Sequence, residues 1–232
     1  MNTVLIDRLK ITHGKSVLVD ISLNIGNSLA LVGESGSGKS LTLKALLDLL
    51  DPGLEAQLQM RCAFEWARGK SVALVPQNPF TALSPLTRIK DQMFVPRERS
   101  EELFGLLGLE KGLLERYPPE LSGGQLQRVV VAIALSSMPR VLLLDEPTTA
   151  LDPVSKETMI SLLKRLQGVM GFSLLFVTHD MGVAASLCEE ICVIRGGRVV
   201  ETGNTAEVIA APKEEYTKAL IDAEFKNRGF RI

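Results

Sequence analysis

The sequence has little that would cross-link the chain or bind a metal through sulfur and imidazole. Only three of its 232 residues are cysteines, with no Cys-x-x-Cys pair, and only two are histidines. A disulfide framework and a zinc motif are therefore not expected. Basic charge is not in excess either, since 26 Lys and Arg residues stand against 27 Asp and Glu residues. Because nucleic-acid binding relies on such an excess, we expect no nucleic-acid partner.

Long apolar runs are also missing. No stretch approaches the about 18 consecutive apolar residues of a membrane-spanning helix. Asp7, Arg8 and Lys10 interrupt the apolar segment that a signal peptide would need, so we expect a cytoplasmic protein. Hydrophobic residues still make up 46% of the chain, which is enough to bury the core of one large domain or two small ones.

Short β-rich runs alternate with helical patterns, which predicts an α/β fold with a mostly parallel sheet. Strands are predicted at residues 4–6, 17–19, 21–25, 29–32, 71–75, 141–144, 172–177, 191–194 and 198–201. Helices are predicted at 39–50, 101–109, 125–135, 154–168 and 181–189, followed by a helical tail. Five prolines separate short helical stretches between 78 and 138. We therefore interpret 78–138 as a helical insertion into a core made of 1–77 and 139–232.

The segment from Gly33 to Ser40 fits the pattern G-x-x-x-x-G-K-[ST] and stands between a predicted strand and a predicted helix. Glycines allow the backbone to wrap a phosphate, and the helix start favours an anion. Lys39 is expected to reach the β- and γ-phosphates of a nucleotide and the Ser40 hydroxyl to bind Mg²⁺. The alternative is a glycine-rich turn with an incidental lysine. The predicted nucleotide-binding residues are Gly33, Glu34, Ser35, Gly36, Ser37, Gly38, Lys39, Ser40 and Leu41.

Two carboxylates follow the apolar run 141–144. Asp145, at the strand tip, is predicted to hold Mg²⁺ directly or through water. Glu146 is predicted to polarise an attacking water as a general base. Alone, this pair of carboxylates is weak evidence for a site, because strands often end in an acidic residue. The phosphate-binding pattern upstream makes a functional role the better interpretation.

A glycine turn, Ser122-Gly123-Gly124-Gln125, precedes the predicted helix 125–135. Its exposed N–H groups predict a second anion site, and an ordinary helix cap is the alternative. Gln77 follows the strand 71–75 and His179 follows the strand 172–177. Gln77 could reach Mg²⁺ or water and His179 a γ-phosphate, although each alone could be a plain polar loop residue.

Together these segments resemble the ATP-binding cassette (ABC) ATPases over essentially the whole chain. The resemblance implies a P-loop NTPase fold of the RecA-like kind, with a mostly parallel sheet, an antiparallel β subdomain and an inserted α-helical subdomain. The matching motifs are Walker A at 33–40, the Q-loop at Gln77, the signature LSGGQ at 121–125, Walker B with the catalytic glutamate at 141–146, the D-loop at 150–152 with Asp152, and the switch histidine at His179.

This resemblance implies two subunits in a head-to-tail dimer, homomeric or heteromeric, with ATP between Walker A of one copy and the signature of the other. Glu146, His179 and Gln77 would be catalytic, and Ser122, Gly123, Gly124, Gln125 and Asp152 would contact the nucleotide. Transmembrane permeases and an extracytoplasmic solute-binding protein would be partners, with the chain peripheral to the cytoplasmic face of the inner membrane. Members of the family usually stack an aromatic ring on adenine near the end of the first strand; His13 occupies that place here.

A narrower resemblance is to the peptide/nickel subfamily of bacterial importers. It rests on 77–85, 117–121, 145–152, 178–183, 201–203, 211–212 and 216–220. The end of the sequence at Ile232, without a longer extension, is similar to the nickel-importer type, which favours uptake of nickel or another metal chelate over peptides. One alternative is a soluble ABC ATPase acting on nucleic acid or ribosomes. Another is a P-loop kinase or GTPase, although no N-K-x-D motif is present.

Overall fold

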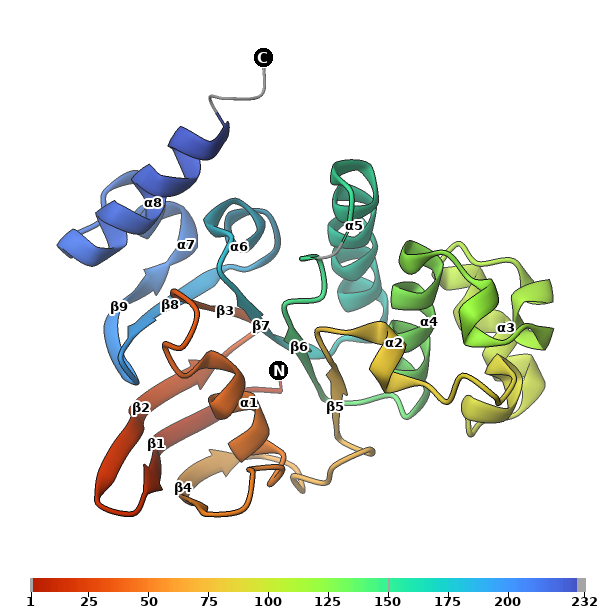
Figure 1. Ribbon diagram of the computed structural model, residues 1–232, viewed down its shortest axis with the longest axis horizontal. Coiled ribbons are helices and arrows are strands. Elements are labelled where there is room, and N and C mark those ends of the chain that lie inside the picture. The colour runs from red at the N-terminus through yellow and green to blue at the C-terminus, as the bar shows by residue number, and fades with distance from the viewer. Residues whose placement is uncertain (1, 150, 229–232) are drawn as a thin grey trace. The chain divides into compact units, whose positions relative to one another are not determined.

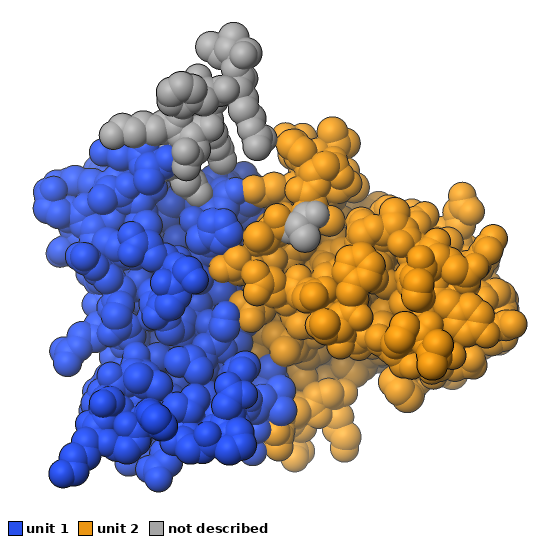
Figure 2. All heavy atoms as spheres, in the orientation of Figure 1, with its two compact units in different colours: residues 1–64, 173–232 blue, residues 65–172 orange. Residues whose placement is uncertain are grey.

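The computed structural model describes residues 2–149 and 151–228. The chain divides into two compact units, shown in different colours in Figure 2. Unit 1 combines residues 1–64 with residues 173–232, and unit 2 is the continuous segment 65–172. Unit 1 is therefore built from both ends of the chain.

The first sheet of unit 1 is antiparallel, with the strand order β2–β1–β4 (Figure 1). Its strands are β1 (Val4–His13), β2 (Ser16–Ile25) and β4 (Leu54–Cys62). β4 is absent from the predicted strands. Its sequence has no β-branched or aromatic residue, the types that are enriched in strands, and most of its side chains are exposed. Pairing with β1 makes it a strand.

The second sheet of unit 1 supports the phosphate-binding pattern. β3 (Ser28–Val32) pairs in parallel with β7 (Ser173–Thr178) and with β8 (Glu190–Arg195). β9 (Arg198–Asn204) pairs with β8 in antiparallel orientation. Every residue of β3 and β7 is buried, as expected for parallel strands covered on both faces. The predicted α/β class with an antiparallel β subdomain is confirmed.

The helices of unit 1 are α1 (Lys39–Leu46), α6 (Met181–Leu187), α7 (Thr205–Ala210) and α8 (Glu215–Arg228). The prediction that the first helix reaches residue 50 is wrong. Asp48 adopts the left-handed conformation, with φ at 53°. The N–H of Leu49 then bonds the carbonyl of Lys44 at 2.8 Å and ends the helix.

Unit 2 contains the parallel pair β5 (Val72–Val75) and β6 (Val141–Asp145). Between the two strands every assigned element is helical: α2 (Pro79–Ala82), η1 (Ile89–Gln92), α3 (Arg97–Leu106), η2 (Lys111–Glu115), η3 (Pro118–Glu120) and α4 (Gly123–Ser136). The boundaries of unit 2 are wider than 78–138, because the unit also includes both strands and α5. A separate helical subdomain at 78–138 stays a prediction.

The helix α5 (Pro153–Met170) follows β6 and has eighteen residues. Its buried side chains lie three or four positions apart, so one stripe packs and the remainder faces outward; they are Met159, Leu162, Leu163 and Leu166. Within 2–149 and 151–228, no helix has both the length and the apolar character of a membrane span.

Candidate nucleotide-binding site

The loop from Gly33 to Gly38 joins the buried end of β3 to the start of α1. Lys39 is only 5% exposed, and its Nζ donates to the carbonyl oxygens of Gly33 at 2.7 Å and Glu34 at 2.8 Å. The ammonium group therefore lies inside the loop, where an anion held by the loop would meet it.

The turn between β8 and β9 holds this loop from the side. The N–H of Gly197 donates to the carbonyl of Ser37 at 3.0 Å. A Cβ on Gly33 would overlap the carbonyl oxygen of Ile194, the penultimate residue of β8, so only glycine fits there. The sequence pattern contains no sign of these contacts, because they join segments that are far apart in the chain.

The remaining loop residues suit a phosphate chain. Ser37 is 5% exposed and its Oγ is buried without a hydrogen-bond partner. The N-terminus of α1 opens at this loop and contributes its N–H groups and its dipole. Glu34, Ser35, Gly36 and Ser40 are exposed, while Gly38 and Leu41 are half-buried. The donors present therefore fit a polyphosphate.

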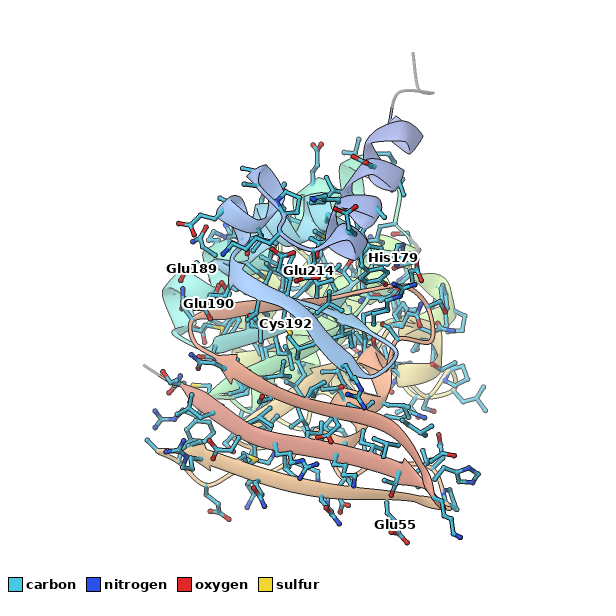
Figure 3. The ribbon with its side chains drawn as sticks, turned by 90° about the vertical axis from the view of Figure 1, so that its left-hand side faces the viewer. Glu55, His179, Glu189, Glu190, Cys192 and Glu214 are labelled. Carbon is cyan, nitrogen blue, oxygen red and sulfur yellow. The ribbon has the colours of Figure 1, made fainter. Side chains whose placement is uncertain are left out.

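Strand register places His179 beside the loop. Val32 of β3 pairs with Thr178 of β7, so Gly33 and His179 both emerge from the carboxyl ends of neighbouring parallel strands. His179, labelled in Figure 3, is exposed, and Asp180 directly after it caps α6 by accepting the N–H of Val183 at 2.9 Å. His179 is thus held at a strand-to-helix junction next to the loop.

His13 is the last residue of β1 and is exposed. It lies two residues after Ile11, which pairs with Val19 of β2. A Cβ on Gly38 would come within 2.8 Å of Val19, so the loop packs on β2 beside this part of β1. The base-stacking role of His13 stays a prediction.

In unit 2, register brings Gln77 and the two carboxylates to one end of a strand pair. Val75 of β5 pairs with Leu144 of β6. Gln77 follows at the exposed surface, and Asp145 and Glu146 are half-buried. Glu146 has a left-handed φ of 45°, and its Oε2 accepts a hydrogen bond from Thr149 Oγ1 at 3.1 Å. The Glu146 side chain is thus held by Thr149 in the segment that follows β6.

The signature turn opens α4 through a reciprocal cap. Ser122 Oγ accepts the N–H of Gln125 at 3.3 Å, and Gln125 Oε1 accepts the N–H of Ser122 at 2.9 Å. The helix begins at Gly123, two residues before the predicted start, because this cap outweighs the poor helix propensity of glycine. Ser122 and Gly123 are exposed.

Asp152 caps α5 beside this turn. Its Oδ1 accepts the N–H groups of Val154 at 3.1 Å and Ser155 at 3.0 Å. Hydrogen bonds from the Ser155 side chain and backbone lower the pKa of the Asp152 carboxyl. Ser155 Oγ also lies 3.6 Å from the position of a Cβ on Gly124, so the D-loop and signature segments are neighbours. Ala150, the first residue of the predicted D-loop, is outside the described residues.

Comparison with known proteins gives a family match and curated relatives. The family model described as ABC transporter matches residues 18–149. The peptidoglycan transport ATP-binding protein YejF of Agrobacterium fabrum is 37% identical over 235 aligned positions, covering 90% of this chain and 43% of that protein. The glutathione import ATP-binding protein GsiA of Escherichia coli K12 is 35% identical, covering 88% of this chain and 38% of that protein. The chain spans about two-fifths of these relatives.

A solved structure also matches over nearly the full length of both chains. It is cbiO1 from Clostridium perfringens, part of the ABC transporter complex cbiONQ. The TM-score is 0.78 at 25% sequence identity, with 99% of this chain and 98% of that chain covered.

Proposed function

The chain belongs to the ABC transporter family, and we propose on this basis that it is the ATP-hydrolysing subunit of an importer for nickel or another metal chelate, or for peptides. The supporting observation is that one chain has two glycine-rich helix starts, the loop before α1 and the turn before α4. Both present N–H groups suited to phosphate oxygens. In a head-to-tail pair of subunits, the loop of one copy and the turn of the other bind the same ATP.

ATP binding redirects Lys39. Phosphate oxygens replace the carbonyls of Gly33 and Glu34 as its acceptors, which gives stronger, charge-assisted hydrogen bonds. The N–H groups of the loop and of the first turn of α1 complete the phosphate contacts. The ring of His13 stacks on adenine over a smaller area than a tyrosine would, so base preference is weak.

Hydrolysis uses the groups at the strand ends. Glu146 polarises the attacking water, His179 hydrogen-bonds the γ-phosphate, and Gln77 orients water. Ser40, Gln77 and Asp145 offer the oxygen ligands that Mg²⁺ prefers, and the ion when bound neutralises charge developing on the phosphates. Asp152 shapes the subunit contact by fixing the start of α5.

The helical part of unit 2 offers a surface for permeases. Phe80, Leu86 and Phe94 occupy one short stretch and are 60%, 87% and 89% exposed. Exposed large apolar side chains so close in the sequence are typical of a protein contact. We propose that membrane permeases dock here, which places the subunit at the cytoplasmic face of the inner membrane, and that a solute-binding protein delivers the solute to those permeases.

The partner class is tested by purification. Capture of the chain from its own cells should bring down membrane permeases; ribosomes or DNA instead would support the soluble alternative. To identify the solute, ATP hydrolysis by reconstituted complexes should be measured with nickel chelates and, separately, with peptides. If only nickel chelates or only peptides stimulate ATP hydrolysis, that class is the transported solute.

The Glu146→Gln variant tests the catalytic assignment. It should retain ATP affinity and accumulate as a nucleotide-bound dimer, while turnover falls roughly 10²- to 10⁴-fold. Glu157→Gln, at an exposed position of α5, is the matched control and should hydrolyse ATP like the parent. Unchanged turnover in Glu146→Gln would contradict the role of Glu146.

A further inference from the structure

A tyrosine from the C-terminal helix contacts the nucleotide loop. The hydroxyl of Tyr216 accepts the backbone N–H of Glu34 at 3.1 Å, across 182 positions of sequence. Glu34 is the second residue of the loop, and Tyr216 lies in the first turn of α8. Tyr216 is not among the residues proposed to bind or hydrolyse ATP.

The Tyr216 ring is itself held by the hairpin that supports the loop. The guanidinium of Arg195 lies over the ring, 4.7 Å from its centroid. Arg195 ends β8 directly before the turn whose Gly197 bonds the carbonyl of Ser37. One short segment therefore touches both the loop and the tyrosine that binds it.

The start of α8 is fixed to β9, which Figure 3 shows between α8 and the β1–β2–β4 sheet, with Glu214 labelled. Glu201 of β9 is 8% exposed and accepts the N–H groups of Lys213 at 2.9 Å and Glu214 at 3.2 Å. Burial opposes the ionisation of Glu201, yet the hydrogen bonds that it accepts hold the pKa of this carboxyl below its usual value. Tyr216 is thus presented from a firmly attached helix start.

Both main-chain polar groups of Glu34 are engaged. Its N–H donates to Tyr216, and its carbonyl accepts from Lys39 Nζ at 2.8 Å and from the N–H of Ser37 at 3.2 Å. When Lys39 turns toward a phosphate, the carbonyl loses one of its donors. The bond to Tyr216 is independent of that exchange, so it continues to hold this end of the loop.

We propose that Tyr216 is a positioning residue for nucleotide binding, which keeps the Glu34 end of the loop in its phosphate-binding shape. A loop that is ordered beforehand loses less conformational freedom when ligand binds, and affinity rises accordingly. This inference rests on the proposed function, because it assumes that the loop binds ATP.

The Tyr216→Phe variant isolates the hydroxyl, since it keeps the ring under Arg195. From the usual worth of one hydrogen bond, the Kd for MgADP and the KM for ATP should rise roughly two- to tenfold. The kcat at saturating ATP should stay unchanged, because the hydroxyl touches no reacting atom. The unfolding midpoint of the nucleotide-free protein should change little, since water can replace the hydroxyl at this exposed N–H.

The chain supplies a matched control in Tyr117, its other tyrosine, which lies under Arg88 with the guanidinium 5.7 Å from its ring centroid. Tyr117→Phe should leave the Kd for MgADP unchanged. An unchanged Kd in Tyr216→Phe overturns the proposal, as does a lower unfolding midpoint without a change in Kd. If the parent chain and Lys39→Ala bind MgADP equally poorly, the proposed function fails and this inference fails with it.

Discussion

Lys39 Nζ donates a hydrogen bond to the carbonyl oxygen of Gly33, six residues earlier, across 2.7 Å. The side chain that is expected to hold a phosphate therefore already satisfies the backbone of its own loop. Nucleotide binding exchanges one set of acceptors for another, and the lysine stays hydrogen-bonded throughout.

Replacing Lys39 with Ala should weaken MgATP binding by roughly ten- to a hundredfold, because one charge-assisted interaction with phosphate is lost. Titration calorimetry measures the change. Lys44→Ala is the matched control, since Lys44 lies on the same helix and pairs with Asp51 at an exposed site. Equal losses in the two variants would mean that general charge, rather than the position inside the loop, governs affinity.

Substitutions at two adjacent glycines distinguish the cost of a positive φ from the cost of steric overlap. Gly196 and Gly197 both have positive φ, 54° and 74°. A Cβ on Gly196 meets nothing within 4 Å, whereas one on Gly197 overlaps the carbonyl oxygen of Leu18. Gly196→Ala should therefore cost about 1 kcal/mol of unfolding free energy, from conformation alone. Gly197→Ala should cost about 3 kcal/mol or more, because overlap adds to strain.

Urea unfolding of both variants measures the difference. Gly197→Ala should also weaken nucleotide binding, because its N–H would move away from Ser37. Equal stability of the two variants would show that the β8–β9 hairpin can shift to accommodate the added Cβ without disturbing β2.

Unit 2 should become less stable at low pH, because the Glu115 carboxylate becomes protonated. Its carboxylate pairs with Lys90 at 2.6 Å, Arg97 at 2.8 Å and Arg88 at 3.3 Å. Hydrogen bonds from Lys90 and then Arg97 lower the pKa of Glu115 from 4.5 to about 2. A lowered carboxyl pKa stabilises the folded state above the unfolded-state pKa, and this contribution disappears as pH falls from 4.5 to about 2.

Thermal unfolding of the parent and of Glu115→Gln between neutral pH and pH 3 tests this dependence. Glu115→Gln should unfold at a lower temperature than the parent at neutral pH, and this difference in unfolding temperature should become smaller as the pH falls. Glu110→Gln is the control; this exposed residue precedes η2 and makes no side-chain cap hydrogen bond. A gap that is constant with pH would exclude the titration of Glu115 as its cause.

His13 should contribute modestly to ATP affinity. If its ring stacks on adenine, His13→Ala should raise the Kd for ATP, and His13→Tyr should lower it, because the larger ring covers more of the base. Both effects are measured by nucleotide titration. An unchanged Kd in His13→Ala would refute the stacking assignment.

The sequence predicts the carboxyl ends of β3, β6 and β7 to within one residue, because the signals there are local. Val32 and Thr178 each end a buried strand, and glycine and imidazole follow at once. Leu144 is the penultimate residue of β6, and the two carboxylates follow it. Parallel pairing then brings such residues to one edge of a sheet. The chemistry of these positions can be read from the sequence before the fold is known.

Contacts made by distant segments are not predictable in this way. Gly197 and Tyr216 contact the loop in the folded chain, where β8 pairs with β3, and neither residue stands in a sequence pattern that indicates its partner. β4 is missed for a related reason, since its polar residues become a strand only through pairing with β1. At β4, tertiary pairing overrides local propensity.

The assembly of unit 1 from both chain ends has a consequence during synthesis. The nascent chain emerges with residues 33–40 early, but Ile194, Gly197 and Tyr216 are translated much later. At usual elongation rates the delay is on the order of ten seconds or more. Throughout that interval the incomplete polypeptide lacks the hairpin and helix that brace its phosphate-binding residues. Residues 33–40 therefore gain all of these supporting contacts only after Tyr216 has been translated.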